Sequence, residues 1–427
     1  MAVTPIDVAR QVLEALVNDY AGMRECDDGL TQDWAALLEE TWRSHGLYDR
    51  QLYAHMTRRL ASLGDPSLRF LPGTNSSFAP LACGFDTHRH GDALYVTRVR
   101  EDERMRLGDA IVSLGSMGPD EYLAQALGNP VSEKDPERQR WDDVLCDLSR
   151  VVVRHPDGTT RRVKLRTFPV AARRPDPCTL SAPGDSTLLL RVTQLDDGEA
   201  AQALSSGAER LARADRLVID LRGCSGGAEV NAYPLLDCVF DEPTNLTEVQ
   251  APETVLTNYT EANCARRERQ IAQLRVLAQG QGAGEGAGLL TWMDENLELV
   301  RANRGAGYVE ETVRPDDVAI AAAPAGQSVV LLTDDGCADA AEWFVRVARQ
   351  SARVTVVGRA TRGSLDYSNP LAIAFEDRFV FVYPMSKSKA ADEGRGMRGQ
   401  GIAPDVVVPF TPEECTRDVI LGRALRQ

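Results

Sequence analysis

The stretch Ser328-Val-Val-Leu-Leu-Thr-Asp-Asp-Gly-Cys-Ala-Asp339-Ala-Ala-Glu342-Trp-Phe decides how this chain folds. Its apolar run predicts a buried strand, Asp-Asp-Gly predicts a turn, and the small residues after Asp339 begin a helix. Asp is a preferred residue at a helix N-terminus, and the spacing from Asp339 to Glu342 is that of a capping box. The stretch therefore predicts a strand, a turn and a helix, with a carboxylate at the turn.

Three further stretches have recognisable patterns: Leu217-Val-Ile-Asp-Leu-Arg-Gly-Cys-Ser-Gly-Gly227, Val354-Thr-Val-Val-Gly-Arg-Ala-Thr-Arg-Gly363 and Gly399-Gln-Gly-Ile-Ala-Pro-Asp405. In order and spacing, the four stretches resemble the C-terminal processing (tail-specific) peptidases and the related tricorn core protease. The resemblance covers most of the chain. It implies an α/β (α+β) fold with a ClpP/crotonase-like βαβ core, a PDZ-like domain and an N-terminal helical region.

The resemblance also assigns the catalytic positions of the family, and none of them carries the usual residue. Asp339 stands where the nucleophilic serine belongs, and Ser67 stands where the tricorn-type histidine follows Gly-Asp-Pro. Ser364 falls on the lysine of the tail-specific peptidases, and Arg398 falls on the tricorn-type glutamate. We therefore expect the usual serine-peptidase machinery to be absent.

The loop Gly223-Cys-Ser225-Gly226-Gly227 follows a predicted strand and resembles the loop that forms the family's oxyanion hole. Glycines allow backbone amides to approach a ligand closely, in conformations that other residues avoid. The resemblance implies that the amides of Gly226 and Ala340 hold a substrate carbonyl. A plain tight turn after a strand is the alternative.

Two interpretations stay open for Asp339 and three for Arg398. Asp339 either caps the helix or faces the reacting centre, where helix amides would favour its ionised form and make it a base. Arg398 pairs with Asp339, receives a substrate carboxylate as a bidentate donor, or is an ordinary solvated arginine.

Cysteine and histidine give weaker hypotheses. Cys337 and Cys224 flank the expected site, but without a predicted histidine nearby, buried and inert thiols are the better interpretation. His88 and His90 alternate on a predicted strand without a carboxylate companion, which does not indicate a metal site. We expect no metal and no cofactor.

The net charge and the composition of the chain restrict the classes of molecule that we expect it to bind. The chain has 427 residues, a formal charge of −15 and a pI near 5.0, which argue against nucleic acid and anionic membranes. Nine cysteines without a C-x-x-C pair fit a reducing compartment. No secretory or membrane-spanning pattern is evident, so we expect a cytoplasmic protein.

Patterns along the chain divide it into three parts. Helical spacing predicts an N-terminal helical region at 1–72, short strands predict the PDZ-like domain at 73–172, and alternating strands and helices predict the α/β core at 173–427. An insertion interrupts the core at about 245–315. Its Gly-rich segment 279–288 is a candidate mobile lid.

Three functions remain compatible with the sequence. The favoured one is a repurposed enzyme, a cyclase, isomerase or lyase, that acts on a small-molecule or peptide substrate with Asp339 as base or orienting group. The second is a non-catalytic pseudo-peptidase that binds a peptide tail or a hydrophobic ligand. The third is a serine-type peptidase with a substitute nucleophile such as Ser225 or Cys337.

Overall fold

The computed structural model describes residues 3–23, 49–126, 131, 134–170, 175–279 and 287–426. The middle of the predicted N-terminal helical region and most of the candidate lid lie outside these residues. The chain forms two compact units, each built from separate stretches of sequence. The first comprises Met1–Ala79, Pro252–Val313 and Asp366–Gly396, and the second comprises Pro80–Ala251, Arg314–Leu365 and Met397–Gln427.

The second unit contains a six-stranded sheet with the order β20-β17-β16-β11-β10-β9. All neighbouring strands are parallel except β9 and β10, which are antiparallel. The strands are β9 (Thr179–Gly184), β10 (Thr187–Arg191), β11 (Arg216–Asp220), β16 (Ser328–Thr333), β17 (Val354–Gly358) and β20 (Val406–Val407). The helices are α7 (Glu199–Ser205), α8 (Ala208–Leu211), α9 (Tyr233–Leu236), α10 (Leu246–Val249), α13 (Ala340–Ala348) and α15 (Val419–Ala424).

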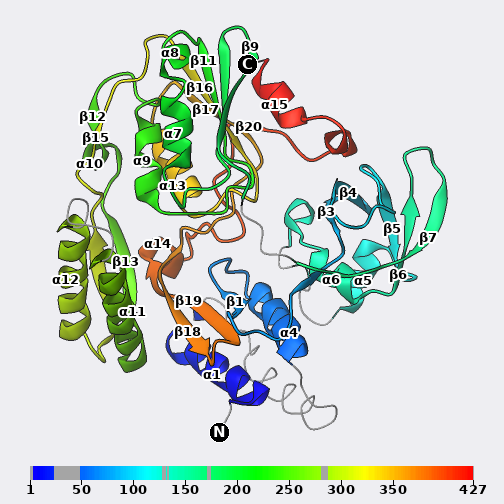
Figure 1. Cartoon of the computed structure of the whole chain (residues 1–427), viewed down its shortest axis with the longest axis horizontal. Coiled ribbons are helices and arrows are strands. Elements are labelled where there is room, and N and C mark those ends of the chain that lie inside the picture. Colours follow the sequence, from blue (N-terminus) through cyan, green and yellow to red (C-terminus); the bar gives the residue numbers. More distant parts are fainter. Residues whose placement is uncertain are drawn as a thin grey trace. The chain divides into compact units, whose positions relative to one another are not determined.

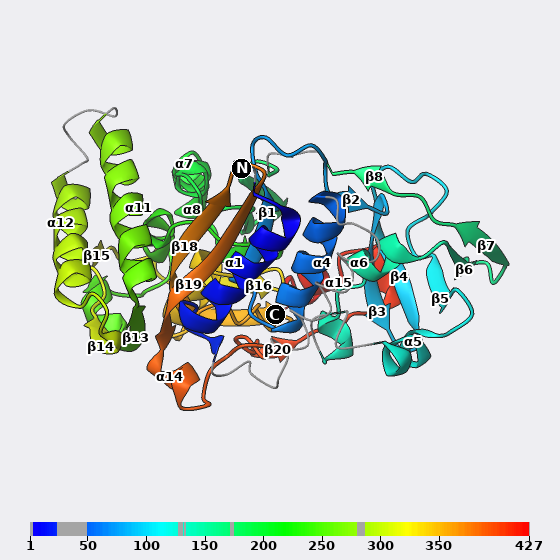
Figure 2. The ribbon, with the colours of Figure 1, turned by 90° about the horizontal axis from the view of Figure 1, so that it is seen from below.

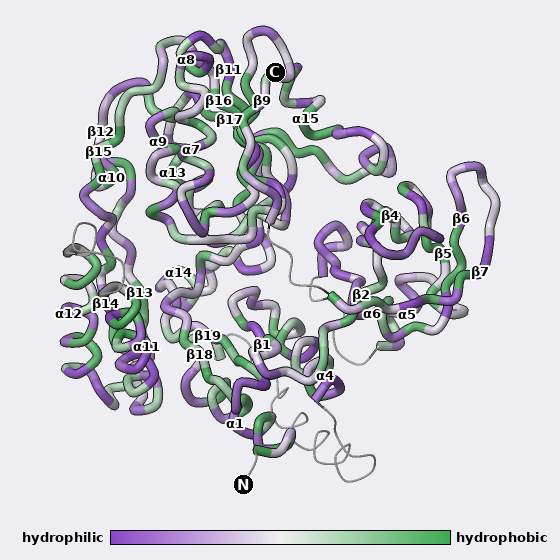
Figure 3. The backbone as a smooth tube through the Cα atoms, in the orientation of Figure 1, coloured by the Kyte–Doolittle hydropathy of each residue, from purple (hydrophilic) through white to green (hydrophobic). Residues whose placement is uncertain are grey.

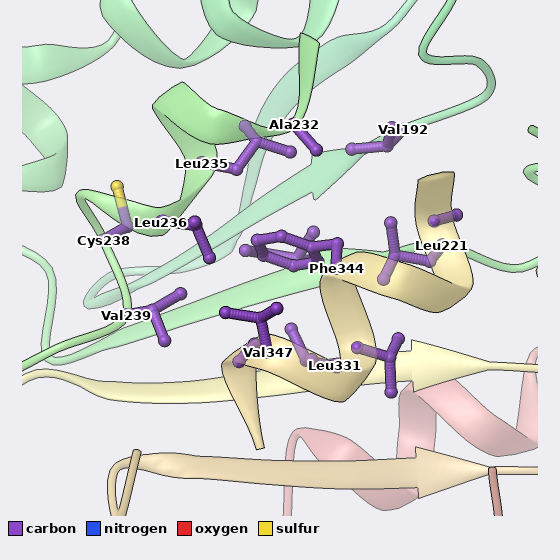
Figure 4. Close-up of a cluster of buried hydrophobic side chains, with 14 of the residues drawn as sticks. Val192, Leu221, Ala232, Leu235, Leu236, Cys238, Val239, Leu331, Phe344 and Val347 are labelled. Atoms are coloured by element: carbon purple, nitrogen blue, oxygen red, sulfur yellow. The ribbon is translucent and has the colours of Figure 1, made fainter. Parts of the chain in front are cut away.

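Apolar residues cover both faces of this sheet, as parallel sheets require. Successive side chains of β16 point to opposite faces, so Leu331 joins the larger core cluster and Val330 joins the smaller one. Helices α7, α9 and α13 lie on the larger side, and α15 covers the other (Figure 1). In the larger cluster, Phe344 of α13 points towards Leu235 and Leu236 of α9 (Figure 4). The central strands are accordingly mostly hydrophobic (Figure 3).

A second sheet in the same unit is antiparallel, with the order β3-β4-β5-β6-β7, and its core includes the buried Trp141. Its strands are β3 (Phe85–His90), β4 (Ala93–Val99), β5 (Ala110–Leu114), β6 (Arg150–Arg154) and β7 (Thr160–Lys164). Around it are α5 (Pro119–Gln125), the 3-10 helix η1 (Pro136–Arg138) and α6 (Asp142–Asp147). Short strand pairs join β2 (Leu81–Ala82) to β8 (Phe168–Pro169) and β12 (Thr244–Asn245) to β15 (Ala319–Ile320).

The first unit is built around an antiparallel sheet with the order β1-β19-β13-β14, in which β18 also pairs with β19. Its strands are β1 (Arg69–Pro72), β13 (Glu253–Tyr259), β14 (Gly307–Val313), β18 (Tyr367–Phe375) and β19 (Phe379–Ser388). Its helices are α1 (Pro5–Asn18), α4 (Asp49–Ser62), α11 (Glu261–Gln279), α12 (Ala287–Ala302) and α14 (Lys389–Asp392). Helix α1 lies along the β18–β19 hairpin, and α11 and α12 lie side by side (Figure 2).

Helices and sheets in this arrangement confirm the predicted α/β class. The compact units do not follow the three predicted stretches, because the expected insertion supplies β13 and β14 to the sheet that also contains β1 of the N-terminal region. The predicted domain boundaries stay predictions. Within the part of the chain that the structure describes, no helix is both long and apolar enough to cross a membrane.

Candidate functional site

Asp339 lies in the turn between β16 and α13, with φ 48° and ψ −121°. Such a backbone is unfavourable for a residue with a Cβ atom and costs about 1–3 kcal/mol. Two hydrogen bonds hold it in place: the Asp339 amide donates to Ser364 Oγ at 2.7 Å, and the Trp343 amide donates to the Asp339 carbonyl at 2.8 Å. The residue is exposed, so a strained backbone presents a carboxylate at the surface of the unit.

The structure contradicts one of the two interpretations of Asp339, the one in which it caps α13 and forms a capping box with Glu342. The Asp339 side chain makes no capping hydrogen bond to the first turn of α13. A capping residue normally has an extended backbone that aims its side chain at the amides of the first turn, and a positive φ does not allow this. Helix capping alone therefore does not explain why an aspartate occupies position 339.

Glu342 is fully buried and binds a different segment, the 361–364 turn. Its carboxylate accepts hydrogen bonds from the Gly363 amide, the Ser364 amide and Ser364 Oγ, each at 2.7 Å, and from Thr361 Oγ1. The Ser364 hydroxyl thus donates to Glu342 and accepts from the Asp339 amide. Ser364 supports the backbone of Asp339. Sequence reasoning did not find this role, because it considered Glu342 only as a possible partner of Asp339 in a capping box.

The carbonyl side of the same turn is held by Arg138 from η1. The buried Arg138 guanidinium donates to the carbonyls of Thr361 at 2.8 Å and Arg362 at 2.7 Å. On the other side, the Ile402 amide donates to Thr361 Oγ1 at 2.7 Å. Both the amides and the carbonyls of the turn are therefore fixed by side chains distant in sequence, a relation that no local pattern reveals.

The glycine loop at 223–227 lies directly beside Asp339. Gly223, Gly226 and Gly227 have φ values of 72°, 143° and 125°, which only glycine adopts readily. A Cβ atom added at Gly226 would lie 2.7 Å from Asp339 Oδ2. The structure therefore places the loop against the Asp339 carboxylate, and any side chain at position 226 would collide with it.

Asp334 connects this loop to the turn that precedes Asp339. Its Oδ1 atom accepts hydrogen bonds from the amides of Gly223 and Gly336, both at 2.9 Å. Burial raises the pKa of Asp334, and the neighbouring Asp335 adds to this effect. The sequence analysis did not single out Asp334, although an aspartate between a buried strand and a glycine turn is a common acceptor for turn amides.

Two amides were predicted to hold a substrate carbonyl, and they differ in their surroundings. Ala340 is the first residue of α13, so its amide is among those that have no partner within the helix. The Gly226 peptide is held on its carbonyl side, where the Leu195 amide donates to the Gly226 carbonyl oxygen at 3.1 Å. The neighbouring Ser225 is exposed. Their predicted roles stay predictions.

Arg398 and Ser67 complete the predicted set. Arg398 is half-buried and belongs to a turn that packs closely on 361–364, since a Cβ atom at Gly363 would lie 2.2 Å from the Met397 carbonyl oxygen. Its pairing with Asp339 stays a prediction. Ser67 belongs to the other compact unit, where its amide donates to Asp65 Oδ1 at 2.8 Å.

The two flanking cysteines are buried, as sequence reasoning favoured. Burial raises the pKa of the Cys224 thiol to about 12 and raises the pKa of Cys337 well above its ordinary value. Burial also lowers the pKa of His88 to about 4. Among the described residues, no group of three or more His, Cys, Asp or Glu side chains is arranged to hold a metal ion.

Two substitutions at position 339, compared with each other, measure how much the strained backbone at this residue lowers the stability of the protein. Asp339→Gly and Asp339→Ala remove the same carboxylate, but only glycine adopts the observed φ and ψ without strain. We expect the glycine variant to exceed the alanine variant in free energy of unfolding by about 1–2 kcal/mol. Urea denaturation of both proteins measures this difference, and equal stabilities would show that the backbone at 339 is not strained.

Comparison with known proteins shows which family and which folds this chain is similar to. Residues 186–408, just over half of the chain, match the family described as Peptidase family S41. Mature CPAF complexed with lactacystin is 15% identical, with a TM-score of 0.62 over 96% of this chain and 95% of that one. Another structure of mature CPAF is 13% identical, with a TM-score of 0.61 over 96% and 94%. The photosystem II D1 C-terminal processing protease is 16% identical, covers 96% and 94%, and has a TM-score of 0.41.

Proposed function

Because the chain belongs to peptidase family S41, we propose that Asp339 replaces the family's nucleophilic serine and serves a reaction other than serine-mediated hydrolysis. The observation that carries this proposal is the backbone of Asp339. Its φ of 48° is strained, its side chain does not cap α13, and its carboxylate lies against the glycine loop. Strain of this kind persists where the surrounding structure enforces it, and it concentrates at functional sites.

The chemistry proposed for Asp339 is proton transfer or substrate orientation. A carboxylate at the N-terminus of a helix is stabilised in its ionised form, so Asp339 suits a proton acceptor better than a proton donor. The Ala340 amide is the best placed to polarise a substrate carbonyl, since it begins the same helix. A carboxylate base at Asp339 with a donor amide at Ala340 fits cyclisation, isomerisation or elimination on a small molecule or peptide. Arg398 is the proposed ion-pair partner of the Asp339 carboxylate. The proposed location is cytoplasmic.

The second candidate is a binding protein without turnover. It is favoured by the hydrogen bonds of Ser364, a residue at one of the family's catalytic positions, whose hydroxyl donates to Glu342 and accepts from the Asp339 amide and so serves the local structure. In that case the site would hold a peptide tail or hydrophobic ligand through the remaining groups. A peptidase with Cys337 as nucleophile has little support, because burial keeps this thiol protonated at neutral pH.

A search for substrates distinguishes the two candidate functions, an enzyme and a binding protein without turnover. The purified protein is incubated with a metabolite extract and with a peptide library, and mass spectrometry follows the mixtures over time. Compounds that disappear, with products of equal mass or of a mass reduced by water, support the isomerase, cyclase or lyase. Compounds that only co-elute with the protein in size-exclusion chromatography support the binding protein. Peptide fragments with water added would contradict both.

We expect no serine-peptidase activity from this chain. Positions 67, 339, 364 and 398 carry neither the family's serine nucleophile nor its histidine or lysine base. The Ser364 hydroxyl does donate to the Glu342 carboxylate, but both residues are buried, so this serine is not accessible to a substrate. Unfolded casein and tagged peptides should stay intact, and a fluorophosphonate probe should not label the protein. Ser225→Ala is the matched control, because labelling or cleavage that disappears in this variant would identify Ser225 as a substitute nucleophile and reject the prediction.

A further inference from the structure

A pair of thiols lies beside the β3–β7 sheet, outside the candidate site. Cys83 and Cys146 have their sulfur atoms 3.6 Å apart, although 63 residues separate them in sequence. Cys83 is buried directly after β2, and Cys146 is half-buried on α6. All the described cysteines are free thiols. The two sulfurs are already in van der Waals contact, and a disulfide would bring them to roughly 2.05 Å.

The two thiols have different surroundings. The Cys146 thiol donates its hydrogen to the Leu81 carbonyl oxygen, with a sulfur–oxygen distance of 3.6 Å. Because the Cys146 hydrogen is used in this way, Cys83 is the better placed to donate its own hydrogen to the Cys146 sulfur. This hydrogen bond lowers the pKa of Cys146 and, with burial, raises the pKa of Cys83. The more accessible sulfur is therefore the better nucleophile, and the buried one stands next to it. Peroxide-sensing cysteines share this arrangement of an accessible thiol with a second thiol in reach.

We propose that Cys146 and Cys83 form a reversible oxidation site that a hydroperoxide converts into a disulfide. Cys146, as the thiolate, attacks the terminal oxygen of hydrogen peroxide; an S–O bond forms, the O–O bond breaks, and hydroxide leaves. Cys83 then gives up its proton and attacks the Cys146 sulfur; the S–S bond forms, and the hydroxyl leaves as water. In total, two thiols lose two electrons and two protons, and one peroxide becomes two waters.

Charge around the pair favours a neutral oxidant. Three carboxylates lie close enough to raise the pKa of Cys146, namely those of Asp142, Asp143 and Asp147. Anionic glutathione disulfide would be repelled by them, whereas hydrogen peroxide carries no charge. The product would link α6 to the segment between β2 and β3, at the edge of the core around Trp141.

The experiment treats the full-length reduced protein with a small excess of hydrogen peroxide at neutral pH. We expect a loss of 2 Da in the intact mass and, after digestion, one peptide pair joined through Cys83 and Cys146. Dithiothreitol should restore both thiols. Cys83→Ser should instead leave a sulfenic acid on Cys146 that dimedone traps, and Cys146→Ser should abolish the reaction at Cys83.

A matched control comes from another half-buried cysteine of the same unit. Cys178→Ser should form the Cys83–Cys146 bond as fast as the unsubstituted chain, because Cys178 contacts Thr193 rather than a second thiol. Any of three results would overturn the proposal. These are disulfides that involve other cysteines, sulfinic acid on Cys146 in place of the Cys83–Cys146 disulfide, and no reaction at a tenfold higher concentration of hydrogen peroxide.

Discussion

In Asp339→Asn, turnover of the natural substrate should fall by about 10²–10⁴-fold, the usual loss when a general acid or base is removed. Asparagine keeps the size of the side chain and tolerates a positive φ as well as aspartate does, but it accepts protons poorly. Substrate binding and melting temperature should therefore change little, and kcat should carry the loss. The measurement compares the rates at which the two proteins deplete the compound that mass spectrometry identifies.

Asp335→Asn is the matched control for this experiment. It removes a half-buried carboxylate from the same turn, four residues before Asp339. We expect it to retain turnover within a few-fold of the unsubstituted chain. If Asp339→Asn retains turnover to the same degree, proton transfer by Asp339 is refuted, and the residue would at most orient the substrate.

Glu342→Ala should lower the free energy of unfolding by about 3–5 kcal/mol. The substitution removes the acceptor for the Thr361 and Ser364 hydroxyls and for the amides of Gly363 and Ser364. These donors are buried, so water replaces the carboxylate poorly. Urea denaturation followed by tryptophan fluorescence measures the loss, and Trp343 in α13 reports on the neighbouring core.

Two further variants test whether the hydrogen bonds cause that loss. Glu342→Gln keeps the volume and one acceptor oxygen, so we expect an intermediate loss of about 1–3 kcal/mol. Glu298→Ala removes an exposed glutamate from a helix of the other unit and should stay within about 0.5 kcal/mol. A Glu342→Ala protein as stable as the Glu298→Ala protein would show that the network around the 361–364 turn contributes little to stability.

The parts of the fold that local sequence determines were predictable. The apolar run before Asp339 is β16, and the small residues after it begin α13. The short strands expected at 73–172 include β4 at Ala93–Val99. The compact units were not predictable, because β19 pairs with β1, more than 300 residues away, and with β13, more than 100 residues away. Register between such distant strands depends on which surfaces are buried together, and no short window contains that information.

The candidate site likewise has features that the local sequence reveals and features that it does not. Glycines at 223, 226 and 227 are visible in the sequence because only one residue type meets their backbone requirement. Glu342 was misinterpreted because its spacing from Asp339 fits a capping box, and only the positive φ at Asp339 excludes that arrangement. The hydrogen-bonding role of Ser364 could not be seen either, because its partners lie 22 and 25 residues away.

Arg138 has a consequence for anyone who wishes to shorten this protein. Its guanidinium binds two carbonyls of the 361–364 turn, while Glu342 binds the opposite side of the same turn. Trimming the chain to residues 186–408, the stretch that defines the family, would delete Arg138 and leave those carbonyls without their charged donor. The minimal working version of the site therefore includes a segment that carries none of its reactive groups, and deletion boundaries should be drawn outside the β3–β7 sheet.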